Sequence, residues 1–190
     1  MGEVTIRPVT PDRWADLVAL FEQRGEPRRC WCTYFRFPRP QWDRMDVTER
    51  RAELDGIVAS GAEPGLLAYA EDGTPVGWVS VAPRAEFLAH LERTRVLKPA
   101  PGDGVWSVLC FAVSPRARRQ GVAHALLAAA VEYARQRGAS AVEGHPLDAT
   151  RRKLMSMEMY VGVSSMFAEA GFTEVERRGV RPLYRLSFDG

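Results

Sequence analysis

A chain of 190 residues has room for a proper hydrophobic core, and we expect residues 1–190 to form one compact domain. Its 46% hydrophobic and 26% charged residues are ordinary for a soluble globular protein. The net charge of +2, from 26 basic and 24 acidic residues, gives no general attraction to nucleic acid or to a membrane surface, so neither partner is expected.

The N-terminus has neither the charged lead nor the apolar centre of a signal peptide, and position 6 lacks the serine or threonine that myristoylation of Gly2 requires. No apolar run approaches the ~20 residues needed to cross a bilayer. We therefore expect a cytoplasmic protein. Cys30 and Cys32 have no second cluster of cysteine or histidine nearby, which predicts reduced thiols rather than a metal site.

The first third of the chain predicts a strand at residues 5–9, a helix from Pro11 that ends by Gly25, and a second helix at residues 48–60. Thr10 followed by proline is a good helix start, and Thr48 is expected to cap the second helix. Between the two helices, residues 26–47 show no clean periodicity but carry large aromatic side chains among arginines.

Two short strands, residues 66–70 and 76–81, flank Asp72-Gly73, which is a strong hairpin signal. A long connection with three prolines follows at residues 83–104 and has room for a short helix at residues 84–94. A connection of that length in a compact domain is usually functional or mobile.

The rest of the chain predicts alternating strands and helices. The expected elements are a strand at 105–113, a helix from Val122 closed by Gly138, a strand at 140–144, a short helix at 163–170, and strands at 172–178 and 183–188. Three antiparallel strands before a strand–helix–strand unit predict a mixed α/β sheet of about seven strands, flanked by about four helices.

An arginine-rich turn, Arg118-Arg119-Gln120-Gly121, joins the central strand to the long helix. Backbone N–H groups at a helix start have no partner inside the helix. Together with the positive end of the helix dipole and the guanidinium groups, they favour binding of a phosphate or pyrophosphate. Gly121 allows the backbone to approach a ligand closely. The absence of a following Lys-Ser/Thr and of G-x-G-x-x-G argues against a Walker-type or dinucleotide site.

The run Arg118-x-x-Gly121-x-Ala123, behind a strand ending in Val113-Ser114-Pro115, resembles the R/Q-x-x-G-x-G/A signature of the GCN5-related N-acetyltransferases (GNAT). The resemblance covers about residues 4–188. It implies the GNAT (acyl-CoA N-acyltransferase) fold, acetyl-CoA as co-substrate, and direct acetyl transfer to a primary amine of a small acceptor. The implied cofactor-binding residues are Phe111, Ala112 and Val113, by main chain, and Arg118, Arg119, Gln120, Gly121, Val122, Ala123 and His124.

The usual general acid of this family is missing from the sequence. A segment that commonly reads Y-x-x-x-G-F is Phe167-x-x-x-Gly171-Phe172 here, and phenylalanine has no proton to give to the thiolate of CoA. Tyr160 and Ser164 are the nearest polar substitutes, with ordinary packing as the alternative for Tyr160. A CoA thiol also has a pKa low enough to leave without an acid.

For the general base, Glu143 and His145 lie at the end of the strand that follows the cofactor helix. The alternatives are that Glu143 binds substrate or a structural arginine, and that His145, which precedes a proline, is an ordinary loop residue. Cys110 on the central strand is expected to be a packed thiol rather than an acyl carrier, because no histidine is paired with it in sequence.

The aromatic and arginine-rich stretch at residues 28–42 is the candidate acceptor pocket, with Trp31, Tyr34 and Phe35 as its expected substrate contacts. It suits a flat, apolar or partly anionic molecule, although aromatic side chains also pin long loops to a protein body. Residues 84–98 would form the opposite wall. Two further classes stay open: a CoA-binding sensor on the same fold, motivated by Phe167, and a nucleic-acid-binding protein, which the near-neutral charge disfavours.

Overall fold

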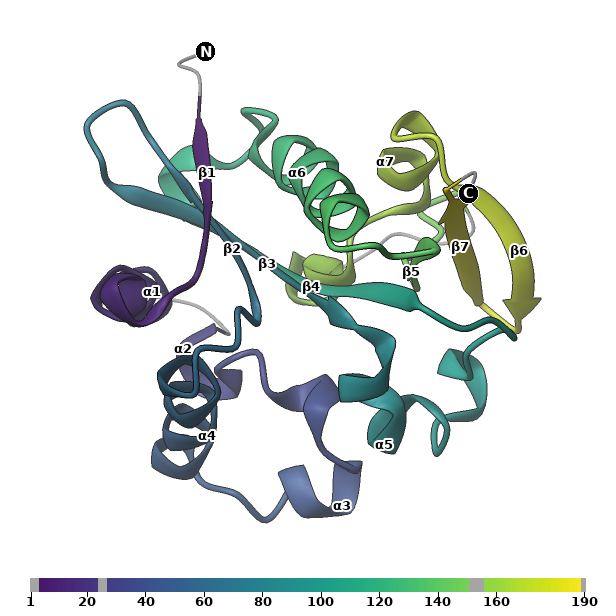
Figure 1. Cartoon of the computed structure of the whole chain (residues 1–190), viewed down its shortest axis with the longest axis horizontal. Coiled ribbons are helices and arrows are strands. Elements are labelled where there is room, and N and C mark those ends of the chain that lie inside the picture. The colour runs from purple at the N-terminus through teal and green to yellow at the C-terminus, as the bar shows by residue number, and fades with distance from the viewer. Residues whose placement is uncertain (1–3, 24–26, 151–155, 189–190) are drawn as a thin grey trace.

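The computed structural model describes residues 4–23, 27–150 and 156–188, and its centre is one seven-stranded sheet (Figure 1). The strands lie side by side in the order β1-β2-β3-β4-β5-β7-β6. Neighbouring strands are antiparallel except for β4 and β5, which run parallel. The bounds are β1 Thr5–Pro8, β2 Gly65–Tyr69, β3 Pro75–Pro83, β4 Val105–Val113, β5 Ala141–Gly144, β6 Thr173–Arg178 and β7 Arg181–Ser187.

Helices cover both faces of the sheet. On one face lie α6 (Val122–Gln136) and α7 (Ser164–Glu169), and on the other lie α1 (Trp14–Phe21), α4 (Val47–Ala59) and α5 (Leu88–Leu91) (Figure 1). Short elements connect them: α2 Pro27–Cys30, α3 Arg39–Trp42, and the 3-10 helices η1 Pro11–Arg13, η2 Tyr34–Arg36, η3 Arg84–Phe87, η4 Arg95–Leu97, η5 Pro115–Ala117 and η6 Ser156–Val161.

The predicted fold class is confirmed, with more helices than expected. The mixed sheet has the predicted strand count, while the described ranges hold seven α-helices rather than about four. The additional helices, α2, α3 and α5, are each 4 residues long, too short for the apolar periodicity that marks longer helices. The predicted end of the first helix at Gly25 lies outside the described residues, and α1 ends at Phe21.

The start of α4 corrects the predicted cap at Thr48. Asp46 is the N-cap, and its carboxylate accepts a hydrogen bond from the N–H of Glu49 at 2.9 Å. The Glu49 carboxylate in turn accepts from the N–H of Asp46 at 2.7 Å. Because this reciprocal capping box satisfies two N–H groups, the helix begins before Thr48, which becomes its second residue.

The apolar core has a layer on each face of the sheet because strand side chains alternate between the faces. Val79 and Phe111 pack on the side of α6 and α7, whereas Trp78 and Cys110 pack on the side of α1 and α4. β4 is buried on both faces, which explains its nearly continuous apolar run. The fold thus places β4 and its parallel neighbour at the centre of the molecule.

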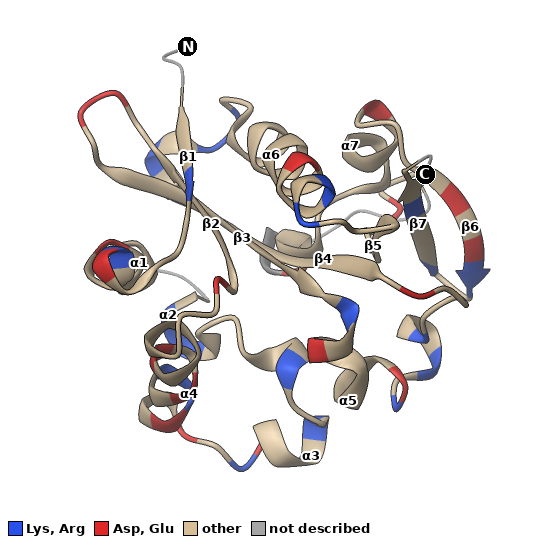
Figure 2. Ribbon diagram, in the orientation of Figure 1, with Lys and Arg blue, Asp and Glu red and all other residues tan. Residues whose placement is uncertain are grey.

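Acidic and basic residues are distributed over most of the elements (Figure 2). This pattern agrees with the near-neutral net charge of +2. None of the helices in the described ranges has the length and apolarity that crossing a bilayer requires.

Candidate active site

β4 and β5 pair over only four residues, from Val105 opposite Ala141 to Val108 opposite Gly144. Beyond Val108, β4 continues to Val113 along β3, whereas β5 ends at Gly144. The register of β4 against β3 shifts at this point, which is a β-bulge and bends the strand. We call residues 109–113 the divergent segment of β4, because no described strand pairs with its β5 side.

The hydrogen-bond pattern of β4 shows which groups of the divergent segment face away from β3. The N–H of Ser114 donates to the carbonyl of Val76 at 2.9 Å. Because antiparallel strands alternate, Ala112 then bonds to β3, while the polar groups of Phe111 and Val113 point to the unpaired side. The Arg118 guanidinium reaches the Val113 carbonyl there, with Nε 3.4 Å from the oxygen. The segment therefore offers main-chain donors and acceptors to a ligand.

The turn between β4 and α6 contains two residues in the left-handed region. Arg119 has a φ of 60°, and Gly121, the N-cap of α6, has a φ of 78° and a ψ of 0°. Glycine adopts this conformation without steric penalty, so Gly121 allows the chain to turn sharply into the helix. The cap makes no side-chain hydrogen bond, which leaves the first N–H groups of α6 open.

The amides of this turn are available to a ligand. Within the described ranges, no hydrogen bond uses the N–H of residues 118–124. Arg118 and Arg119 are exposed beside these amides, and the turn is marked by its basic residues in Figure 2. Unpaired amides, the helix dipole and guanidinium groups together favour the binding of an anion.

The predicted cofactor residues at this turn have distinct environments. Gln120 and Gly121 are exposed, whereas Val122 is 4% exposed and packs into the core beneath the turn. Ala123 is half-buried, and His124 lies on the surface with Nε2 3.2 Å from Glu169 on α7. The turn therefore presents main chain toward a ligand, with small or outward-pointing side chains around it.

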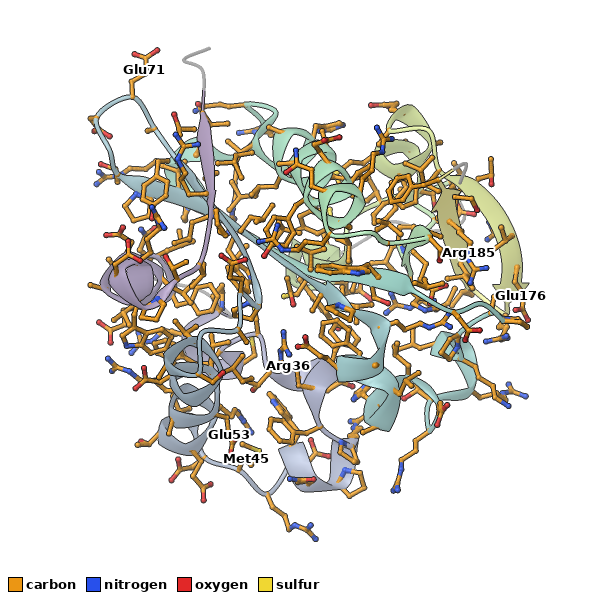
Figure 3. The ribbon with its side chains drawn as sticks, viewed as in Figure 1. Arg36, Met45, Glu53, Glu71, Glu176 and Arg185 are labelled. Atoms are coloured by element: carbon orange, nitrogen blue, oxygen red, sulfur yellow. The ribbon has the colours of Figure 1, made fainter. Side chains whose placement is uncertain are left out.

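Glu143 is enclosed by two arginines. The residue is 0% exposed, and its carboxylate oxygens lie 3.2 Å from Nη1 of Arg84 and 2.8 Å from Nη2 of Arg185, which is labelled on β7 in Figure 3. We call these three residues the Glu143 clasp. Both carboxylate oxygens of Glu143 are engaged by guanidinium groups. The geometry therefore matches the structural alternative for Glu143 rather than a general base.

The clasp also fixes the proline-rich connection before β4. Arg84 Nη1 donates to the carbonyl of Ala100 at 2.7 Å, and Arg185 Nη1 donates to the carbonyl of Pro101 at 2.9 Å. Arg84 also donates to the carbonyl of Gly102. The two arginines thus connect β5, β7 and this loop, which explains how a connection of this length is held against the sheet.

His145 follows Gly144 directly, at the point where β4 and β5 part. It is 2% exposed, and in the described chain neither ring nitrogen has a hydrogen-bond partner. Burial, and to a smaller extent the positive charges of Arg181 and Arg178, lower the pKa of His145 to about 3. The ring is neutral at pH 7 and too weak a base to take a proton from an ammonium group efficiently.

This depressed pKa predicts a loss of stability in acid. As the pH falls from 6.5 toward about 3, the unfolded chain binds a proton on His145 that the folded chain does not. Stability is full above pH 6.5 and falls by about 1.4 kcal/mol per pH unit within that window. Urea denaturation at pH 7.5 and at pH 5.0 measures this effect. Between the two pH values, the free energy of unfolding of His145→Asn should fall by about 2 kcal/mol less than that of the wild type.

The matched control for this experiment is His124→Asn, because His124 is exposed on the surface of α6. That variant should keep the wild-type loss between the two pH values. Equal losses in the wild type and in His145→Asn would contradict the predicted burial of a neutral imidazole.

Tyr160 lies in η6, beside the divergent segment. Its side chain packs against apolar clusters that include Cys110 and Phe35, with the ring centroids of Tyr160 and Phe35 6.2 Å apart. Burial raises the pKa of Tyr160 to about 12, so the phenol keeps its proton at pH 7. Tyr160 therefore remains a candidate proton donor.

Ser164 and Phe167 lie on α7 and are engaged in the fold. The hydroxyl of Ser164 donates to the carbonyl of Leu147 at 3.3 Å, which weighs against a role as acid. Phe167 is 0% exposed and packs its ring 5.0 Å from that of Phe172. A Cβ on Gly144 would lie 2.6 Å from the Phe167 ring, so this phenylalanine fills the space where α7 meets β5.

The expected acceptor contacts are mostly core side chains. Trp31 is 2% exposed and packs against Trp14 and Phe21, with ring centroids 6.0 and 5.6 Å apart. Phe35 is 4% exposed, whereas Tyr34 is half-buried. The burial of Trp31 and Phe35 favours the alternative in which aromatic rings pin this segment to the protein body, and Tyr34 is the most accessible of the three.

Two thiols that lie far apart in the sequence are in contact, and no sequence pattern indicates it. Cys32 and Cys110, 78 positions apart, are both buried, with Sγ atoms 3.0 Å apart. Burial raises the pKa of the Cys32 thiol well above its usual range, and the hydrogen bond to Cys110 adds to this. Cys110 is thus the packed thiol that the sequence predicts, and it joins the aromatic segment to β4.

A surface hollow of about 490 Å³ lies elsewhere, lined by Thr5, Tyr69, Ala70, Glu71 and Gly73. It lies where β1 meets the β2–β3 hairpin, from which Glu71 projects in Figure 3. Because β3 and the paired edge of β4 separate it from the divergent segment, this hollow is not part of the candidate site.

Comparison with known proteins identifies the family. The model of the acetyltransferase (GNAT) family matches residues 26–152, more than half of the chain. The chain belongs to the GNAT family. An aminoglycoside N(6′)-acetyltransferase type 1 from Serratia marcescens is 30% identical over 136 residues, which cover 72% of this chain and 80% of that protein.

Solved GNAT structures share the fold of the whole chain. The PaiA N-acetyltransferase of Thermoplasma acidophilum, in complex with coenzyme A, has a TM-score of 0.57 at 12% identity, covering 98% of this chain and 99% of its own. A diaminobutyrate acetyltransferase of Paenibacillus lautus, in complex with L-2,4-diaminobutyric acid and coenzyme A, has a TM-score of 0.53 at 16% identity. The match covers 100% of this chain and 99% of that chain.

Proposed function

We propose that this GNAT protein is an acetyl-CoA-dependent N-acetyltransferase that moves an acetyl group to a primary amine of a small acceptor. The observation that carries the proposal is the pairing of a divergent segment with an open amide turn at the start of α6. Coenzyme A in the PaiA structure and the aminoglycoside acceptor of the Serratia enzyme support the donor and the acceptor class.

In this proposal the donor is bound mainly by main chain. The diphosphate lies on the amides of residues 118–123, with Arg118 and Arg119 beside it. The pantetheine arm runs along the divergent segment, where the polar groups of Phe111 and Val113 face it. An N–H group of this segment stabilises the charge that develops on the thioester oxygen. Positioning and carbonyl polarisation then supply most of the rate enhancement.

Proton transfer in this proposal uses one side chain and solvent. Tyr160, whose pKa of about 12 keeps it protonated, gives a proton to the departing thiolate. The acceptor amine loses its proton to water, because Glu143 is held in its clasp and burial lowers the pKa of His145 to about 3. Transfer is direct, since Cys110 is turned to the α1 and α4 side and bonds to Cys32.

Thiol release from acetyl-CoA in the presence of a panel of primary amines tests this function. We expect acceptor-dependent release of coenzyme A, with a product heavier by one acetyl group in mass spectrometry. Coenzyme A binding without release across the panel would instead favour a sensor, the alternative that Phe167 motivates. Absence of coenzyme A binding in calorimetry would refute both.

A further inference from the structure

Buried nitrogen atoms without partners gather where β5 ends. Arg181 begins β7, and its Nη1 atom is buried with no hydrogen-bond partner among the described residues. His145 is 2% exposed, and neither of its ring nitrogens has a hydrogen-bond partner among the described residues. Folding has removed these polar atoms from water, a cost that a bound polar group would offset.

The sheet places these two side chains on one face. Arg185 and Glu143 are ion-paired across β7 and β5, with atoms 2.8 Å apart. Side chains two or four residues apart in a strand share a face, so Arg181 lies on the side of Arg185 and His145 on the side of Glu143. In agreement, Arg181 is the charged group with the largest influence on the pKa of both His145 and Tyr160.

The other charges at this position are already balanced. Glu143 is held in its clasp, and the guanidinium of Arg178 binds the carboxylate of Glu176 at 2.5 Å. No carboxylate in the described ranges forms an ion pair with Arg181. One positive charge at the start of β7, partly withdrawn from water, is therefore left without a counter-ion among the described residues.

We propose that Arg181 and His145 bind the carboxylate of the acceptor, so that this protein acetylates small primary amines that also carry a carboxylate. A guanidinium presents a planar pair of donors that matches a carboxylate. One unpaired cation balances one negative charge, whereas a doubly charged phosphate would leave a buried excess. Tyr160 packs in the same apolar cluster as Cys110 of β4, and the charge of Arg181 acts on its phenol, so an acceptor held here would reach the thioester side of β4. This inference rests on the function proposed above.

Amines that differ only by a carboxylate test the inference: L-lysine against cadaverine, and L-ornithine against putrescine, with acetyl-CoA as donor. The wild type should favour the carboxylate-bearing member at least about 10-fold in kcat/KM. Arg181→Gln should remove this preference and leave the KM for acetyl-CoA unchanged. Arg177→Gln, at an arginine of β6 that is ion-paired to Glu174, is the matched control and should keep the preference.

Results of two kinds, from the wild type and from the variant, would overturn the inference. One is a wild-type preference for the carboxylate-free amines, or for an aminoglycoside over both amino acids. The other is an undiminished carboxylate preference in Arg181→Gln.

Sodium acetate measures anion binding without turnover. Acetate should raise the melting temperature of the wild type more than sodium chloride does at equal ionic strength, and Arg181→Gln should lose this increment. Without acetate, Arg181→Gln should melt at or above the wild-type temperature, because it removes an unpaired, partly buried cation. A lower melting temperature assigns Arg181 a structural role and overturns the inference.

Calorimetry with coenzyme A separates this inference from the proposed function. If the wild type binds coenzyme A but acetate raises its melting temperature no more than chloride does, only the proposed acceptor class is refuted. A protein that binds no coenzyme A refutes the acetyltransferase function itself.

Discussion

Replacing Gly121 with valine is expected to weaken the binding of coenzyme A by about 100-fold while the protein stays folded. Gly121 has a φ of 78° at the N-cap of α6, where its backbone orients the open amides of the turn. A β-branched residue disfavours this conformation by roughly 1–2 kcal/mol, so the turn relaxes and the amides no longer converge on a diphosphate. Calorimetric titration with coenzyme A measures the loss.

Gly138→Val is the matched control for this substitution. Gly138 follows the other end of the same helix with a φ of 76°, and a Cβ there would meet no atom within 4 Å. The control should show the same backbone strain, about 1–2 kcal/mol of stability, with unchanged affinity for coenzyme A. Equal affinities in the two variants would remove the turn from the cofactor site.

Replacing Glu143 with glutamine is expected to lower the free energy of unfolding by about 3 kcal/mol. The side chains of Arg84 and Arg185 are only 13% and 16% exposed, and the amide would leave both cations without a counter-charge. The proline-rich loop that these arginines hold through residues 100–102 should loosen as well. Urea denaturation measures the change in stability.

Glu174→Gln provides the comparison for Glu143→Gln. Glu174 is paired with Arg177 on β6 and is 31% exposed, so its loss should lower stability by less than about 1 kcal/mol. The pH profile of turnover distinguishes the roles of Glu143. If Glu143 is only structural, Glu143→Gln should show a pH profile of the same shape as the wild type. If the variant keeps wild-type stability but loses the acidic limb of the profile, Glu143 is the general base.

Local signals in the sequence predicted the turn and its surroundings. All the signals for this turn lie within about twenty positions: the proline after β4, the glycine before α6 and the apolar spacing of that helix. A short stretch of sequence therefore predicts both the turn and its chemistry. The start of α4 is also encoded locally, since Asp46 and Glu49 have capping-box spacing, a signal that the expected cap at Thr48 leaves out.

The roles of the candidate catalytic residues are harder to predict from the sequence, because the groups that surround them come from distant parts of the chain. Glu143 is a plausible base in sequence, yet its partners Arg84 and Arg185 lie 59 and 42 positions away. The thiol contact of Cys32 spans 78 positions. Neither separation produces a periodic pattern, so only the folded chain shows that these groups are paired.

Because β4 pairs with β5 over only part of its length, the hydrogen bonding of the sheet is interrupted at its centre. Over residues 109–113 one edge of this central strand has no pairing strand among the described residues, a property that usually belongs to the outermost strands. A pantetheine arm lying there would act as a missing strand and join the two halves of the sheet. Its binding would then add directly to the stability of the native state. Resistance of the protein to heat and to proteases would rise and fall with the concentration of its donor.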